Sequence, residues 1–217
     1  MSRYLIAGSD TGVGKTWVTC RLIEALRDEG ARPAGFKPIA CGDRGDAVAL
    51  LGAAAESDLT LDAINPWFFS TPAAPYTAAV IEGRRPDMGA IDRALAQVSA
   101  IRDPVLIEVA GGLMTPLSEI DAMRDLAARW ACPVILVVPN RLGALAQALA
   151  NAECVRAAGL TLAAVVLNDM PEPHASEGAL DADGLRQTNF AVLEERLPGK
   201  VFRSDPESLR ELARRIR

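Results

Sequence analysis

Short apolar segments alternate along the chain with longer segments in which apolar residues recur every three or four positions. The apolar segments, which predict strands, lie at residues 3–8, 33–38, 103–112, 133–138, 162–167 and 200–202. The segments with helical spacing, which predict helices, lie at residues 14–30, 47–55, 88–99, 120–131, 143–158, 181–196 and 206–216. Strands that alternate with helices predict an α/β fold, in which a mostly parallel sheet carries helices on both faces. We therefore expect a three-layer architecture.

Several positions indicate how these elements end or where they lie. Residues 133–138, Pro-Val-Ile-Leu-Val-Val, form the most continuous apolar run and predict a strand at the centre of the sheet. Gly30 predicts the end of the first helix, because glycine favours the position after the last helical residue. Residues 62–88 combine prolines with clustered aromatic residues, so we expect an irregular segment that crosses a helix or rims a pocket. Residues 171–178 predict a polar loop.

The size and composition of the chain bound its class. Its 217 residues, half of them hydrophobic, predict one domain over residues 1–217 with a single large core. A net charge of −5 and a pI near 5.0 argue against a nucleic-acid binder, which is usually basic. The four cysteines form no C-x-x-C pair, and with one histidine they predict neither a zinc site nor a disulfide framework.

The apolar runs are all shorter than the roughly 18 residues of a membrane span, so we expect no membrane association. The chain opens directly on a predicted strand and a glycine-rich loop. We therefore expect no signal peptide and a cytoplasmic location.

The clearest chemical signal is Gly8–Thr16, Gly-Ser-Asp-Thr-Gly-Val-Gly-Lys-Thr, between the first predicted strand and the first predicted helix. A strand, a glycine-rich loop, Lys-Thr and a helix together are the context of a phosphate-binding loop. Backbone N–H groups of such a loop converge on phosphate oxygens, and the helix N-terminus adds partial positive charge. Lys15 can then neutralise the β- and γ-phosphates, and the Thr16 hydroxyl can ligate Mg²⁺. The alternative is a glycine turn that only joins the strand to the helix.

Three charged residues follow at places where a ligand of this loop could lie. Lys37 ends the second predicted strand, and ligands of open α/β sheets bind beyond the carboxyl ends of strands. A solvated lysine at a strand end is an equal alternative. Asp46 is expected at the N-cap of the helix at 47–55, where capping alone would explain it, or it could hold a metal ion. Glu108 would be costly to bury unpaired in its apolar strand, so we prefer a metal ion or metal-bound water to a structural hydrogen bond.

The loop departs from two common patterns and resembles a third. Ser9 stands where most phosphate-binding loops have a glycine, which comes one residue earlier here, at Gly8. Asp10 stands where the partition and septum-site ATPases carry an extra lysine. The remaining pattern, Gly-x-Asp-Thr-x-Val-Gly-Lys-Thr, resembles the loop of the dethiobiotin synthetase family.

Further segments resemble the same family and occur in its order, from residue 3 to about residue 170. They are Gly-Phe-Lys-Pro-Ile-Ala at 35–40, Gly-Asp-Ala-Val-Ala-Leu at 45–50, Asn-Pro-Trp-Phe-Phe at 65–69, Pro-Ala-Ala-Pro at 72–75, Ile-Glu-Val-Ala-Gly-Gly at 107–112, Thr-Pro-Leu at 115–117, the apolar strand at 133–138, Leu-Gly at 142–143, Ala-Gly-Leu at 158–160 and Asn-Asp at 168–169. Each segment alone is a weak signal, whereas their shared order is specific.

This resemblance implies a phosphate-loop NTPase fold and an enzyme of biotin biosynthesis that uses ATP and Mg²⁺. The family makes the ureido ring of dethiobiotin from 7,8-diaminopelargonate and CO₂ or bicarbonate. An amine of the diamine first forms a carbamate, which attacks the γ-phosphate to give a mixed carbamic–phosphoric anhydride. The second amine then closes the ring and releases phosphate. The family is a homodimer that holds the diamine across its interface.

The resemblance also implies roles for residues of this chain. The implied catalytic residues are Lys37, Lys15 and Thr11, with Lys37 holding the carbamate beside the γ-phosphate. The implied metal ligands are Thr16, Asp46 and Glu108, whose hard oxygen atoms suit Mg²⁺. The implied nucleotide-binding residues are Asp10, Gly12, Val13, Gly14, Lys15, Thr16, Trp17 and Asn168, the last of which would read adenine. The implied substrate-binding residues are Thr11, Lys37, Cys41, Gly111, Leu142 and Gly143.

The departures from the family pattern lie nearer the diamine than the nucleotide. Cys41 stands where the family usually has serine, Val109 where it has glycine, and Ala146 where it often has asparagine. Two alternatives to a dethiobiotin synthetase stay open. One is a related ATP-dependent ligase that acts on another amine or carboxylate. The other is a nucleotide-switch ATPase that binds a protein partner, against which the absent loop lysine at Asp10 and the presence of Lys37 both argue.

Overall fold

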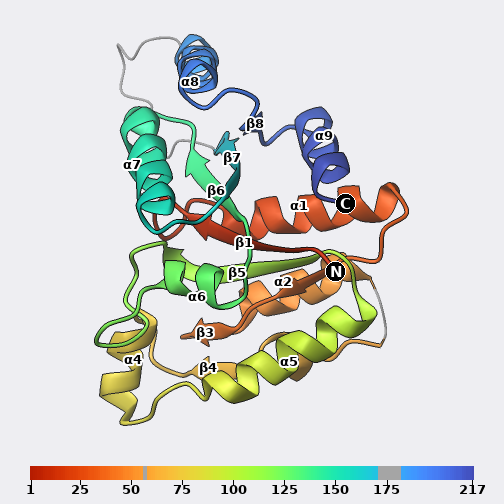
Figure 1. Ribbon diagram of the computed structural model, residues 1–217, viewed down its shortest axis with the longest axis vertical. Helices are drawn as coiled ribbons and strands as arrows, with labels where there is room; N and C mark the ends of the chain where they lie inside the picture. The colour runs from red at the N-terminus through yellow and green to blue at the C-terminus, as the bar shows by residue number, and fades with distance from the viewer. Residues whose placement is uncertain (56–57, 171–181) are drawn as a thin grey trace.

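The computed structural model of the protein describes residues 1–55, 58–170 and 182–217. Its centre is a fully parallel, six-stranded sheet with the order β2-β5-β1-β6-β7-β8 (Figure 1). The strands are β1 (Arg3–Gly8), β2 (Ala34–Phe36), β5 (Val105–Gly112), β6 (Val134–Pro139), β7 (Leu162–Asn168) and β8 (Val201–Arg203). The predicted α/β class is confirmed, and the apolar run at 133–138 forms an inner strand of the sheet, as expected.

Helices cover both faces of this sheet (Figure 1). One face carries α1 (Lys15–Asp28), α2 (Gly45–Ala54) and α9 (Pro206–Ile216), which pack together. The other face carries α5 (Met88–Ile101), α6 (Met123–Arg129) and α7 (Ala144–Ala157), with α8 (Ala182–Arg196) beside α7 and β8. None of the helices in the described part of the chain has the length and apolar character needed to cross a membrane.

The region predicted to be irregular contains regular elements. They are α3 (Leu61–Ile64), β4 (Trp67–Phe69) and α4 (Pro75–Glu82). β4 pairs in parallel with β3 (Ile39–Cys41) in a small second sheet, where Ile39 lies opposite Trp67. The prediction of an irregular segment at 62–88 is therefore wrong over these elements. The pairing joins distant parts of the chain, which a local pattern cannot reveal, and Pro75 starts a helix at a position that favours proline.

The helix boundaries show one error that concerns the site. α2 begins at Gly45 with Arg44 at its N-cap, so the prediction that Asp46 caps this helix is wrong. Asp46 lies in the first turn, and its side chain makes other contacts. The helix predicted at 120–131 is shorter at both ends, whereas Gly30 follows α1 with a φ of 80°, as predicted. The predicted polar loop at 171–178 lies outside the described residues.

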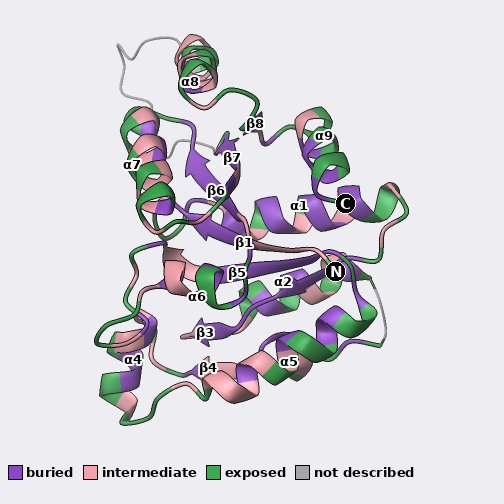
Figure 2. Ribbon diagram, viewed as in Figure 1, coloured by how far each residue is buried: buried purple, intermediate pink, exposed green. Residues whose placement is uncertain are grey.

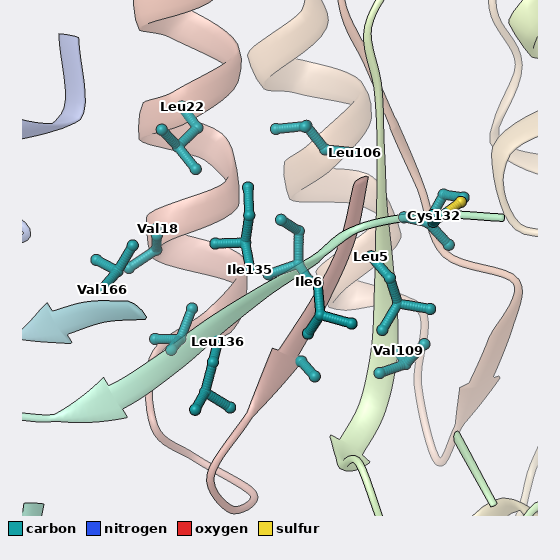
Figure 3. Close-up of a cluster of buried hydrophobic side chains, with 14 of the residues drawn as sticks. Leu5, Ile6, Val18, Leu22, Leu106, Val109, Cys132, Ile135, Leu136 and Val166 are labelled. Carbon is teal, nitrogen blue, oxygen red and sulfur yellow. The ribbon is translucent and has the colours of Figure 1, made fainter. Parts of the chain in front are cut away.

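The inner strands are buried on both faces, so alternation along a strand decides which layer each side chain joins (Figure 2). Ile6 of β1 points toward Val18 of α1, whereas Leu5 points to the opposite side of the sheet, beside Val109 (Figure 3). Glu108, the neighbour of Val109 in β5, therefore faces α1. This alternation separates the acid that reaches the site from the valine that fills the core.

Candidate active site

The loop between β1 and α1 forms one wall of a cleft of ≈ 770 Å³ at the carboxyl ends of β1, β2 and β5. Segments that follow β2, β4 and β5 form the other walls. Of the residues predicted from sequence, the cleft is lined by Thr11, Gly12, Gly14, Lys15, Thr16, Lys37, Cys41, Asp46 and Gly111. The segment Pro72–Pro75 also lines it, so the proline-rich region does rim a pocket.

Contacts within and beneath the loop hold it in shape. Gly14 has a φ of 84°, and a Cβ added there would lie 2.1 Å from Nδ2 of Asn168. Asn168, at the end of β7, donates from Nδ2 to the Val13 carbonyl at 2.9 Å. On the other side, Lys15 Nζ donates to the Asp10 carbonyl at 3.3 Å. The loop is thus supported by β7, and the start of α1 faces the cleft.

Four side chains from separate elements converge at the base of the cleft. The Thr16 hydroxyl, in the first turn of α1, lies 2.8 Å from Asp46 Oδ1 and 2.9 Å from Glu108 Oε1. Lys37, directly after β2, donates from Nζ to Asp46 Oδ2 at 2.6 Å and to Glu108 Oε1 at 2.7 Å. Asp46 comes from α2 and Glu108 from β5, so the fold assembles a cluster whose members are far apart in the sequence.

The charges in this cluster depend on one another. Burial alone would lower the pKa of Lys37, but the carboxylates of Glu108 and Asp46 raise it above its ordinary value. Burial alone would raise the pKa of Asp46, but Lys37 and Thr16 hold it below its ordinary value. Lys37 and Asp46 are therefore both charged at neutral pH. Burial and the nearby Lys37 together lower the pKa of Lys15.

Thr16, Asp46 and Glu108 present hard oxygen donors side by side, which is the ligand chemistry that Mg²⁺ prefers. Within the described residues no group of three or more His, Cys, Asp or Glu side chains could form an all-protein metal cage. Two carboxylates and a hydroxyl fit Mg²⁺, because this ion usually keeps several waters and takes further ligands from substrate phosphates. The adjacent N-terminus of α1 and the Lys15 ammonium carry the positive charge that would bind such phosphates.

Several predicted nucleotide-binding residues lie outside the lining of this cleft. Asp10 is exposed and accepts a hydrogen bond from the Thr11 N–H at 2.7 Å, and Val13 is buried beneath the loop. Trp17 is 47% exposed and faces a second hollow of ≈ 420 Å³ between α1 and α9. The Arg21 guanidinium lies over its ring at 5.7 Å. The cleft therefore gathers the phosphate side of the predicted nucleotide site, and Trp17 lies beyond it.

The predicted substrate residues fall in two places. Cys41 and Gly111 line the cleft, and a Cβ on Gly111, whose φ is 67°, would lie 2.4 Å from Thr115 Oγ1. Leu142 and Gly143 lie before α7, outside the cleft lining, with the Leu142 side chain 86% exposed.

The three departures from the family pattern are placed differently. Cys41 alone lines the cleft, where burial raises the pKa of its thiol to about 11 although the nearby Lys37 lowers it. Val109 is fully buried in the core, and Ala146 is exposed on α7. Of the three, only Cys41 lies in the cleft of its own chain.

Two supporting residues escaped the sequence analysis. Asn65, nearly fully buried, donates to the Lys37 carbonyl at 2.7 Å and the Trp67 carbonyl at 3.1 Å. Thr19, fully buried, lies with its hydroxyl 3.1 Å from Glu108 Oε2. A polar residue on the buried, mostly apolar face of a helix was a visible signal for Thr19. Asn65 had no comparable signal, since its role depends on the turn that follows α3.

Known proteins with similar sequences share one activity in their names. The AAA domain family matches residues 2–202. An ATP-dependent dethiobiotin synthetase of Akkermansia muciniphila is 40% identical over 172 residues, covering 79% of this chain and 80% of that protein. The corresponding enzyme of Escherichia coli K12 is 38% identical over 181 residues, covering 79% of each. The corresponding enzyme of Pseudescherichia vulneris is 36% identical over 215 residues, covering 94% of this chain and 84% of that protein.

Similar solved structures support the fold alone. A MinC:MinD cell division complex of Aquifex aeolicus aligns over 99% of this chain and 95% of that chain, with a TM-score of 0.56 and 14% identity. A plasmid partition protein of Borrelia burgdorferi aligns over 99% of both chains, with a TM-score of 0.55 and 11% identity. At such low identity these neighbours say nothing about partners or activity.

Proposed function

The chain belongs to the ATP-dependent dethiobiotin synthetase family, and from this premise we propose that it closes the ureido ring of dethiobiotin from 7,8-diaminopelargonate, CO₂ and ATP. One observation carries the proposal. Lys37, a buried cation, lies at the base of a cleft that also presents Lys15, Thr16 and the carboxylates of Asp46 and Glu108. A simple nucleotide switch has no evident need for a second cation there, whereas an enzyme that activates an anionic substrate does.

The loop and its lysine would hold the ATP phosphates. Backbone N–H groups at the start of α1 donate to phosphate oxygens, and the Lys15 ammonium offsets their charge where it grows in the transition state. When bound, Mg²⁺ supplies further positive charge to the transferred phosphoryl group. Thr16, Asp46 and Glu108 would be its ligands, supported by the distances that already bring their oxygens together.

Lys37 would orient the anion that reacts with ATP. One amine of the diamine adds to CO₂ and loses a proton, which gives a carbamate. Lys37 would act as a fixed cation rather than a base, because the ordinary pKa of lysine, about 10.4, lies far above neutral pH. The carbamate oxygen attacks the γ-phosphorus and ADP leaves. The second amine then attacks the carbamoyl carbon and loses a proton, the bond from that carbon to the phosphate oxygen breaks, phosphate leaves, and the ureido ring is closed.

We also assign the remaining predicted contacts to this reaction. Thr11, on the cleft wall, would contact both substrate and phosphate, and Cys41 and Gly111 would line the substrate side. Asn168 would read the adenine edge with its second amide hydrogen and its side-chain carbonyl, for which the described residues provide no hydrogen-bond partner. The exposed Leu142 supports a homodimer in which Leu142 and Gly143 reach the partner's diamine. A cytoplasmic location suits an enzyme that draws on ATP.

The test is product formation by the purified protein. It is incubated with 7,8-diaminopelargonate, ATP, Mg²⁺ and labelled bicarbonate, and labelled dethiobiotin is measured by mass spectrometry. We expect product in amounts equal to the phosphate released, and neither product nor ATP turnover from a folded Lys15→Ala variant. ATP turnover without labelled product would overturn the proposal. Phosphate release stimulated by a different amine would instead identify a related ligase.

A further inference from the structure

The Glu108 carboxylate uses its two oxygens for different partners. Oε1 faces the base of the cleft, where Lys37 Nζ lies at 2.7 Å and the Thr16 hydroxyl at 2.9 Å. Oε2 faces α1, and Thr19 is the one donor that contacts it in the described part of the chain, at 3.1 Å. Both Thr19 and Glu108 are fully buried. The carboxylate is thus held on both sides, at Oε1 by Lys37 and Thr16 and at Oε2 by Thr19.

A purely helical explanation of Thr19 accounts for only part of this geometry. Its hydroxyl also lies 2.8 Å from the Lys15 carbonyl one turn earlier, a bond that threonine often makes in helices. The hydroxyl has one proton to share between the Lys15 carbonyl, which is the nearer acceptor, and the Glu108 carboxyl group, to which hydrogen bonds are generally stronger when it carries charge. Beyond Lys15, the other large buried residues of α1, Val18, Leu22, Ile23 and Leu26, are apolar. A hydroxyl among them is explained by the acid that it meets.

We propose that Thr19 is a positioning residue for the divalent-cation site. Its hydrogen bond to Oε2 fixes the terminal torsion of Glu108, which is otherwise broad, so that Oε1 points at Thr16 and the cleft. Partners that hold a ligating carboxylate from behind typically control metal affinity. The proposal rests on the proposed function, because it takes Glu108 to be a ligand of Mg²⁺.

The chain provides a matched control for the helical bond. The exposed Thr188 hydroxyl in α8 donates to the Gly184 carbonyl at 2.7 Å, which is the same bond one turn back, and among the described residues it makes no hydrogen bond to an acid. Thr19→Val and Thr188→Val each remove a hydroxyl that bonds to the carbonyl one turn earlier, at a buried and at an exposed position respectively. Thr19→Ser keeps the hydroxyl and removes only the methyl group.

The experiment measures ADP affinity by calorimetry, once in excess Mg²⁺ and once in EDTA, for each folded variant. The ADP affinity in Mg²⁺ divided by the ADP affinity in EDTA measures the contribution of the cation to binding. We expect Thr19→Val to lower this ratio about tenfold or more, Thr19→Ser to stay within about threefold of the wild-type ratio, and Thr188→Val to leave it unchanged. The affinity in EDTA should stay the same for all. If Thr19→Val does not fold, Thr19→Ala replaces it with the same expectation.

The outcomes separate this proposal from the function on which it rests. If the ADP affinity of the wild type did not depend on Mg²⁺, the proposed cation site itself would be wrong. A wild-type ratio that Thr19→Val leaves unchanged would overturn the role of Thr19 and keep the site. Equal losses in Thr19→Ser and Thr19→Val would show that packing of the methyl group, not the hydroxyl, is what matters, and would also overturn it.

Discussion

Lys37 Nζ lies 2.7 Å from Glu108 Oε1 in an ion pair whose side chains are only 4% and 0% exposed. The register of the sheet produces this contact. Phe36 of β2 pairs with Ile107 of β5, so the residues that follow each of them are brought together. A buried ion pair contributes little to stability, because desolvation offsets the attraction. The pair is therefore better explained by the chemistry of the cleft than by the needs of the fold.

The two acids should control the response to Mg²⁺. Asp46→Asn and Glu108→Gln each keep the side-chain shape and lose an anionic oxygen ligand. Even partners behind a ligand commonly change metal affinity by ~10-fold, so we expect the Mg²⁺ concentration for half-maximal activity to rise at least that much. A Mg²⁺ titration of product formation beside a melting curve checks this. Unchanged Mg²⁺ dependence with a lowered melting temperature would mean that both acids are structural.

Much of the fold and most of the cleft could be predicted because their signals are local. Apolar runs marked the strands, and Gly-Lys-Thr after β1 marked the loop. Lys37 directly follows a short apolar strand, and Glu108 is the one charged residue within an otherwise apolar strand. Parallel strands end at one edge of a sheet, so these residues could be expected to meet there.

The errors arose where contacts join distant segments. β3 and β4 are short strands that pair with each other, and neither shows a pattern long enough to read. Asp46 follows glycine at the start of a helix, which is a plausible cap by local rules. Its carboxylate instead meets Thr16 and Lys37, both supplied by other elements. Asn65 was missed for the same reason, because it supports Lys37 across a turn.

Val109 should matter to stability and not to chemistry. Its side chain packs beside Leu5 in the core, on the side of the sheet away from Glu108. Val109→Gly, which restores the usual family residue, leaves a cavity and a looser strand, so we expect the free energy of unfolding to fall by about 3 kcal/mol. Urea unfolding measures this, and Val109→Ala should lose less. Higher product formation per folded molecule in Val109→Gly would contradict this placement.

Glu82 should make the rim of the cleft sensitive to acid. Its Oε1 accepts hydrogen bonds from the Thr71 N–H at 2.8 Å and the Ser70 hydroxyl at 3.1 Å, just before the rim segment Pro72–Pro75. The Thr71 N–H above all, with Arg84 and Ser70, lowers the pKa of Glu82 to about 2. A carboxylate whose pKa is lower in the folded state stabilises the fold above its unfolded pKa, roughly 4.3, and less as the pH falls.

We therefore expect Glu82→Gln to melt below the wild type at pH 7. The difference should hold down to about pH 4.3 and shrink from there towards the folded pKa. Melting temperatures of both proteins from pH 7 to the lowest pH at which both fold check the sign. A difference that grows on acidification would contradict the assigned hydrogen bonds.

Lys37→Met should separate binding of nucleotide from formation of product. Methionine keeps the length of the side chain but removes the cation that would orient the carbamate. We expect dethiobiotin formation to fall by at least ~10²-fold, with ADP affinity in EDTA nearly unchanged, since Lys15 and the loop remain. Stability should fall too, by about 2–4 kcal/mol, because Glu108 keeps its threonine partners but loses its buried counter-charge.

The remaining lysine provides the control for this change, because Lys200 is exposed and lies far along the chain in the turn before β8. Lys200→Met removes the same charge and should leave product formation and melting unaffected. Product and nucleotide binding are then compared on folded Lys37→Met protein at a temperature below its own transition. If that variant forms product at the wild-type rate, the role of Lys37 is wrong and the synthetase activity stands. If both product and nucleotide affinity are lost together, Lys37 instead supports the phosphate site, and the carbamate must be oriented by another group in the cleft.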